Sequence, residues 1–176
     1  FDQLHYHGTK AVDYCIKELN IDSSMSILEI GSGIGGPARH IANETGATVT
    51  ALELQPDQNK LAAELTDRCG LTKKVIHLEG DFMTHDWQEK KFDAIVSWLT
   101  LYHILDHSIL LQKCHNLLNP GGFFYVEDLI SLQPFSDFEL SELLREIYGN
   151  HFSDYQTYKL EIEKVELQTE FKIFTI

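Results

Sequence analysis

Short apolar runs alternate with segments of helical periodicity along the first three quarters of the chain. The apolar runs lie at 25–30, 48–53, 74–79, 92–97 and 123–126. They are rich in Ile, Val, Leu and Phe, which is typical of strands buried on both faces of a parallel sheet. No tight two-residue hairpin signal interrupts the alternation. The pattern therefore predicts βαβ units and an α/β fold, with a doubly wound, mostly parallel, twisted sheet and helices on both faces.

The last part of the chain gives a weaker signal. An amphipathic pattern predicts a helix at 136–148, and loose alternation over 162–176 predicts one late strand. We expect a single domain over 1–176. Its parts are an N-terminal arm and helix (1–20), a core (21–130), and a helical cap with the last strand (131–176). Because the chain starts at Phe1, we expect a domain cut from a longer chain. Because the pattern shows one late strand and not two, we also expect the C-terminal strands to be incomplete.

Composition narrows the class of protein. The 176 residues are 43% hydrophobic, which suits a globular domain with a substantial core. No apolar run approaches the ~20 residues that a membrane span needs, and the start does not resemble a signal peptide. The three cysteines are odd in number and form no CxxC pair, which favours reduced thiols and a cytoplasmic location.

The charge balance bears on partners. The formal net charge is −13, with only 14 Lys and Arg residues, whereas a nucleic-acid binder carries a basic face. We therefore expect no nucleic-acid or membrane partner. A small neutral or cationic molecule fits the charge better, and other domains of a longer chain would be further partners.

A glycine-rich turn at 31–36 lies between the first strand and a helix that opens at Pro37. Its four glycines would let a ligand lie against bare backbone. A strand, a glycine turn and a helix N-terminus together form a nucleotide or adenosyl site. Three of the glycines also fit the GxGxxG dinucleotide pattern, so the turn alone leaves the ligand open.

Acidic residues beside the turn favour one ligand over the other. Glu29 lies inside the apolar first strand, where a carboxylate is costly unless it is hydrogen-bonded or paired with a cation. Glu53 closes the second strand, at the position of an acid that binds ribose hydroxyls, and Asp81 follows the third. A pyrophosphate would be repelled by this negative cleft, whereas an ammonium and a sulfonium would be attracted. The charges therefore favour S-adenosylmethionine.

The motifs also carry a family resemblance. Residues 28–36 (LEIGSGIGG) resemble the first motif of class I S-adenosylmethionine-dependent methyltransferases. The segments 51–53, 80–82, 92–97 and 117–122 resemble the later motifs, in order and at the usual spacing. The resemblance implies a Rossmann-like methyltransferase fold and S-adenosylmethionine as the cofactor.

The resemblance also implies roles for single residues. It places Glu29 and the Gly31–Gly35 backbone at the methionine end of the cofactor, and Glu53 on the ribose. It places Asp81 and Phe82 on adenine, and Ser97 with Trp98 beside the sulfonium. The implied cofactor-binding set is Glu29, Gly31, Ser32, Gly33, Gly35, Glu53, Leu54, Asp81, Phe82, Ser97 and Trp98.

The N-terminal segment 2–9 (DQLHYHGT) and the turn 34–39 narrow the resemblance. Together they resemble small-molecule N-methyltransferases of the sarcosine/dimethylglycine type and the methyltransferase domain of ovothiol synthases. That resemblance implies methyl transfer to a nitrogen of a small molecule, either an amine or the imidazole of a thiohistidine.

The reaction sets the choice of candidate catalytic residues. Methyl transfer is an in-line displacement, in which the protein mainly aligns the reactants. An amine acceptor must be neutral, so a base or an anionic neighbour assists. The candidates are Tyr6, His7, His103 and Asp128. His103 and His107 have the spacing of metal ligands, but no third ligand is apparent in the sequence, so we expect no metal.

Two other functions remain open from the sequence. Tyr155 and Lys159 have the YxxxK spacing of short-chain dehydrogenases, which use NAD(P), although the glycine turn has a different spacing from theirs. A binding module for S-adenosylmethionine without catalysis would carry the same cofactor motifs, and only turnover separates it from an enzyme.

Overall fold

A computed structural model describes residues 2–3, 5–131 and 133–165. The chain divides into two compact units. The first contains 1–101 with 117–128, and the second contains 102–116 with 129–176. The single domain expected over 1–176 stays a prediction.

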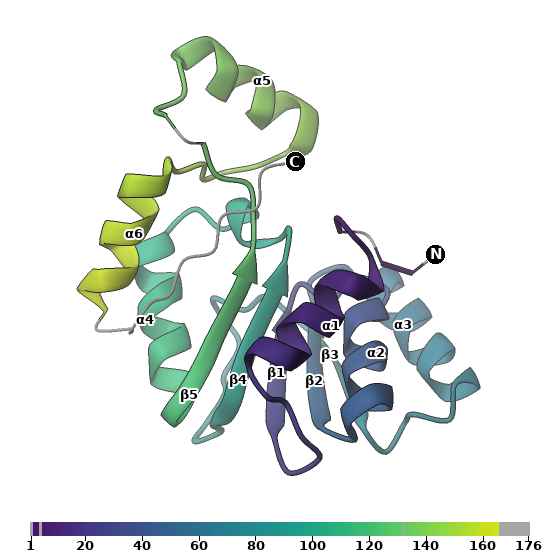
Figure 1. The fold of residues 1–176 in the computed structure, drawn as a ribbon. Helices are drawn as coiled ribbons and strands as arrows, with labels where there is room; N and C mark the ends of the chain where they lie inside the picture. Colours follow the sequence, from purple (N-terminus) through teal and green to yellow (C-terminus); the bar gives the residue numbers. More distant parts are fainter. Residues whose placement is uncertain (1, 4, 132, 166–176) are drawn as a thin grey trace. The chain divides into compact units, whose positions relative to one another are not determined.

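The first unit is built on a five-stranded parallel sheet in the order β3-β2-β1-β4-β5 (Figure 1). Its strands are β1 (Ser26–Ile30), β2 (Thr48–Glu53), β3 (Val75–Glu79), β4 (Phe92–Trp98) and β5 (Leu118–Glu127). The first four lie where the apolar runs predict them, whereas β5 includes the run at 123–126 but begins five residues earlier, at Leu118. The parallel α/β fold is confirmed. The strand order reverses between β1 and β4, and ligands of open parallel sheets bind at such a switch point, outside the carboxyl ends of the strands.

Three helices belong to the same unit: α1 (Thr9–Glu18), α2 (Gly36–Thr45) and α3 (Pro56–Arg68). Apolar residues of α1 and α2 pack against one face of the sheet. The core of this contact contains Val12, Cys15, Ala38, Ile41, Ile27, Val49, Ala51, Ala94 and Val96. The intervening strand residues Leu28, Leu52 and Ile95 are also buried, so the central strands are buried on both faces, as their sequence predicts.

The second unit carries η1 (Leu101–His103) from Tyr102 onward and most of α4 (His107–Leu117), with α5 (Asp137–Ile147) and α6 (Tyr155–Lys164). Asp106 caps α4, because its Oδ1 accepts from the Ile109 N–H at 3.0 Å. A capping box of Ser136 and Glu139 starts α5 at the predicted place.

The late strand predicted over 162–176 is wrong for the part that the structure describes. Asp154 caps a helix there by accepting from the N–H groups of Gln156 and Thr157. Tyr158, Ile162 and Val165 are buried, and their spacing of four and three residues fits a helical face as well as a loose alternation. Residues 166–176 lie outside the described residues.

None of the helices in the described part of the chain is both long enough and apolar enough to cross a membrane.

Candidate functional site

The turn after β1 follows a left-handed path. Gly31, Gly33 and Gly35 have φ angles of +70°, +53° and +78°, which favour glycine. The N–H groups of Gly31 and Ser32 both donate to the Leu52 carbonyl at 2.9 Å. The turn is therefore fastened to the end of β2 before α2 begins.

Protein atoms fill part of the space that the glycines leave. A Cβ on Gly31 would lie 2.1 Å from Thr100 Cγ2, and one on Gly36 would lie 2.1 Å from the Asp2 carbonyl oxygen. A Cβ on Gly35 would lie 2.9 Å from Arg39 and His77 side-chain atoms. At these three positions the absent Cβ therefore makes room for the protein itself, and contact of their backbone with a ligand stays a prediction.

Glu29 lies inside β1 with only 2% of its surface exposed. Burial raises the pKa of its carboxyl to about 8, and the Glu53 charge adds to this, while the Ala38 N–H and the Arg39 charge oppose it. The group is therefore mainly neutral at pH 7, which corrects the fixed negative charge inferred from the sequence. A cation bound beside it would favour ionisation again.

Two buried polar atoms mark the turn as a place for a polar ligand. Glu29 Oε2 and Ser32 Oγ are buried, and neither has a hydrogen-bond partner among the described residues. Buried polar atoms are rarely left unsatisfied. The methionine end of S-adenosylmethionine carries an ammonium and a carboxylate, so it fits a carboxyl and a hydroxyl at this position.

Glu53 ends β2 beside the turn and is 7% exposed. Its Oε2 accepts from the Gly33 N–H at 2.7 Å, and its Oε1 accepts from the Gln55 N–H at 2.9 Å. The carboxylate therefore fixes the glycine turn to the segment that leads into α3. Leu54 follows it with 60% of its surface exposed, which provides an apolar surface next to the acid.

Asp81 and Phe82 follow β3. Asp81 is exposed, and its Oδ1 accepts from the Met83 N–H at 2.8 Å. Phe82 is buried with its ring centroid 6.1 Å from that of Trp87, which in turn packs edge-on against Phe92. The Phe82 ring thus belongs to an aromatic cluster, and its role beside adenine stays a prediction.

Ser97 and Trp98 end β4 and are both buried. The Ser97 hydroxyl donates to the Ile30 carbonyl at 3.0 Å, so it links β4 to β1. The Trp98 ring centroid lies 5.6 Å from that of His5 and 6.1 Å from that of Tyr125. Trp98 therefore joins the N-terminal arm to the carboxyl end of the sheet.

Arg39, which the sequence reasoning missed, anchors the arm to the turn. It is 5% exposed on α2 and donates to the Ile34 carbonyl at 2.8 Å. It also forms an ion pair with Asp2 at 2.7 Å. A signal was available, because Arg39 stands among the apolar residues of an amphipathic helix, where a charge needs a partner.

The predicted catalytic residues of the arm differ in exposure from their neighbour. Tyr6 is 47% exposed, and His7 is exposed with a φ of +61°. His5, which is not among the predicted catalytic residues, is half-buried against Trp98, and burial lowers its pKa. Burial thus favours the neutral form of the His5 imidazole, and His5 is less exposed than His7.

A second missed residue ends β5. Glu127 is half-buried and accepts from the Tyr125 hydroxyl at 2.8 Å. Burial raises its pKa, although the Tyr125 hydrogen bond and the His7 charge oppose this. The predicted Asp128 follows it and is partly exposed. The first unit thus places Glu127 beside Tyr125, which itself touches Trp98.

His103 belongs to the second unit, whereas the other three catalytic candidates belong to the first. It is exposed, its Nδ1 lies 3.1 Å from the Tyr148 carbonyl oxygen, and its ring centroid is 4.2 Å from that of Tyr102. The YxxxK pair lies on α6, where Lys159 pairs with Glu163 at 3.8 Å.

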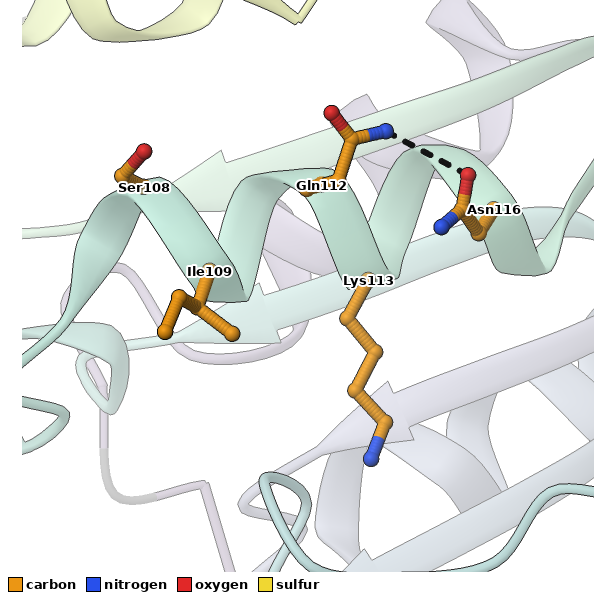
Figure 2. Close-up of a pocket in the computed structure, with 5 residues that line it drawn as sticks. All are labelled: Ser108, Ile109, Gln112, Lys113 and Asn116. Carbon is orange, nitrogen blue, oxygen red and sulfur yellow. Dashed lines mark hydrogen bonds between the residues drawn. The ribbon is translucent and has the colours of Figure 1, made fainter.

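Figure 2 shows the residues that line a pocket along α4, none of which belongs to the predicted site. The pocket is lined by Ser108, Ile109, Gln112, Lys113 and Asn116. The Gln112 amide donates to Asn116 Oδ1 at 3.3 Å. Because all five residues come from one helix, the pocket has no opposing wall and does not form a cofactor site.

Comparison with known proteins identifies the family. Residues 28–126 match the family model described as a methyltransferase domain. The sterol 24-C-methyltransferase ERG6B of Gibberella zeae is 29% identical over 150 residues, which cover 85% of this chain and 36% of that protein. The chain thus spans about a third of that relative's length.

Solved structures share the fold. Phosphoethanolamine N-methyltransferase 2 of Haemonchus contortus, in complex with S-adenosyl-L-methionine, matches with a TM-score of 0.83 and 20% identity, over 93% of this chain and 38% of that one. A candidate sarcosine dimethylglycine methyltransferase from Galdieria sulphuraria matches with a TM-score of 0.80 and 20% identity, over 89% and 59%. Because the family model covers more than half of the chain, the chain belongs to the methyltransferase domain family, as a class I domain with S-adenosylmethionine as its cofactor.

Proposed function

We propose that the protein transfers a methyl group from S-adenosylmethionine to a nitrogen atom of a small polar molecule. The observation that carries the proposal is the polar group around Trp98 at the carboxyl end of the sheet. His5 and Tyr125 both lie against Trp98, and Glu127 accepts a hydrogen bond from Tyr125. Such groups suit an acceptor that forms hydrogen bonds and carries a proton to be lost.

The cofactor supplies an activated methyl group on a sulfonium, so the protein needs to hold the acceptor in line and in its neutral form. Glu127 suits the second task. Its raised pKa makes its carboxylate a better proton acceptor than an exposed glutamate. The Tyr125 hydroxyl fixes one carboxylate oxygen at 2.8 Å, which leaves the other to face an acceptor. The predicted Tyr6, His7 and Asp128 lie on the same segments and would contact the acceptor. The catalytic role of His103, which belongs to the second unit, stays a prediction.

The sterol methyltransferase relative raises a second acceptor class, because its name specifies transfer to a carbon of a sterol. An apolar acceptor would cover the half-buried Glu127 carboxylate without offering it a hydrogen bond, and that is costly. The polar surroundings of Trp98 therefore favour a nitrogen acceptor. Among such acceptors, a thiohistidine, a glycine derivative and phosphoethanolamine differ in the groups that flank the nitrogen.

A transfer assay with methyl-labelled S-adenosylmethionine tests the proposal against these four acceptor classes. We expect label on one of the three nitrogen compounds and none on a sterol. We expect Glu127→Gln to lower turnover about 100-fold while S-adenosylhomocysteine binds as before. Glu79→Gln, at the end of β3, is the matched control and should keep full turnover. Label on the sterol alone would contradict the nitrogen acceptor, and tight cofactor binding without any transfer would favour a binding module.

A further inference from the structure

Three potential metal ligands meet within the second unit. His107 is the first residue of α4, His151 lies between α5 and α6, and Glu161 lies within α6. One ligand atom from each of the three residues lies within 4.8 Å of the other two. His107 and His151 are 44 positions apart in sequence, and His151 and Glu161 are 10 apart. This spacing matches no short metal-binding motif.

The distances between the ligand atoms are too long for hydrogen bonds and are close to those around a bound metal ion. His107 Nδ1 lies 3.9 Å from Glu161 Oε2, and His151 Nε2 lies 3.6 Å from the same oxygen. Both distances exceed those of a hydrogen bond. A tetrahedral ion with bonds of about 2.1 Å separates its ligand atoms by roughly 3.4 Å. A contraction of a few tenths of an ångström would therefore bring the carboxylate oxygen and each imidazole nitrogen to such a separation.

Burial is graded across the cluster. The His107 side chain is only 3% exposed, whereas those of His151 and Glu161 are 23% and 20% exposed. The His107 ring is also held edge-on by Tyr158, at 5.7 Å between centroids. One ligand is thus fixed in the interior of the unit, while the other two lie where an ion can enter from solvent.

Two contacts would have to change. The His107 and His151 rings are stacked, with centroids 3.7 Å apart and planes 24° apart, whereas an ion lies in the plane of each ring that binds it. The Ser153 hydroxyl lies 2.7 Å from His151 Nε2, the atom nearest to Glu161. A rotation of the partly exposed His151 ring changes both contacts at once, and it frees the hydroxyl or turns it toward the ion.

We propose that His107, His151 and Glu161 bind one divalent transition-metal ion of the zinc class, which ties the start of α4 to α6. Two imidazole nitrogens and one carboxylate oxygen are ligands that Zn²⁺ accepts, with a water or the Ser153 hydroxyl in the fourth position. Three hard oxygen ligands would instead suit Mg²⁺ or Ca²⁺. The site is independent of methyl transfer, because no residue of the predicted cofactor set belongs to it.

Titration of the chelator-treated 176-residue chain with Zn²⁺, followed by calorimetry, tests the proposal. We expect one ion per chain, and a melting temperature that rises by roughly 5 °C when free Zn²⁺ is 100-fold above the Kd. Glu161→Gln and His151→Ala should each weaken binding at least 10-fold. The matched controls are Glu163→Gln on α6 and His115→Ala on the exposed side of α4, and both should bind Zn²⁺ as the wild type does.

Two further measurements distinguish the loss of a metal site from a folding defect and from an effect on the cofactor site. Co²⁺ added to the wild type should give the visible absorption of a four-coordinate site, and Zn²⁺ should displace it. S-adenosylhomocysteine affinity should be the same in the Glu161→Gln variant, so a failure here leaves the proposed methyl transfer standing. No saturable binding of Zn²⁺, or binding that the His115→Ala control loses as much as the site variants do, would overturn the proposal.

Discussion

The raised pKa of Glu29 predicts how the stability of the folded protein depends on pH. The pKa of this carboxyl rises from an ordinary value of 4.5 to about 8 in the folded protein, chiefly through burial. The folded state therefore binds a proton that the unfolded state releases above pH 4.5. The corresponding stability is complete below pH 4.5 and is lost as the pH rises through 8.

The size of the effect follows from the same two values. A difference of about 3.5 in pKa, at 1.36 kcal/mol each, corresponds to about 5 kcal/mol. Glu29→Gln has nearly the same shape and keeps an oxygen for the Ala38 N–H, but it does not titrate. The variant should therefore gain stability over the wild type as the pH rises, by about 5 kcal/mol between pH 4 and pH 9.

Urea unfolding of both proteins, from pH 4 to pH 9, measures this difference. The difference in unfolding free energy should change by about 1.4 kcal/mol per pH unit between pH 4.5 and 8. Glu79→Gln, an exposed site at the end of β3, should show no such change. A difference between Glu29→Gln and the wild type that stays constant over this range would refute the assignment of a buried, neutral carboxyl.

Three further predictions concern the turn and the arm. Gly31→Ala places a Cβ against Thr100 and should lower the free energy of unfolding by more than about 2 kcal/mol. The control Gly70→Ala has the same φ of +70° but no atom within 4 Å of the new Cβ, so it should cost only about 1 kcal/mol. Equal losses of stability in thermal unfolding would argue against the contact with Thr100. Glu53→Ala removes the acceptor for the Gly33 and Gln55 N–H groups and should weaken S-adenosylhomocysteine binding by ~1–3 kcal/mol, while Glu79→Ala should not; unchanged calorimetric affinity would contradict the role of Glu53. Arg39→Leu removes the ion pair with Asp2 and should lower the free energy of unfolding by ~2–4 kcal/mol. The arm should then be cleaved before residue 9 in limited proteolysis. An arm that resists cleavage as the wild type does would show that other contacts hold it.

Much of the first unit follows from local sequence patterns. The strands were predictable because a run buried on both faces must be apolar throughout, as in β1 and β4. Glu29 was informative because it breaks such a run. Its position was predicted, but its charge was not, since the protonation state depends on how completely the fold removes water from the carboxyl.

The remaining features depend on contacts between distant segments. Thr100 and Asp2 lie where Cβ atoms on Gly31 and Gly36 would be. The local sequence cannot show whether a glycine makes room for a distant part of the chain or for a ligand. The helix α6 was missed because Tyr158, Ile162 and Val165 suit two periodicities over so short a span. Glu161 lies close to His107 and His151 only in the folded chain, because the three residues are far apart in sequence. Sequence spacing offered no third ligand, so it led to the expectation of no metal.

The atom that receives the methyl group decides between a nitrogen acceptor and a carbon acceptor. Methyl-labelled S-adenosylmethionine, incubated with the protein and the acceptor that it labels best, allows the product to be resolved by NMR. We predict a new N-methyl group, with turnover that depends on Glu127 and not on Glu79. A methyl group found on carbon, or a bound cofactor that is never consumed with any acceptor, would contradict the account.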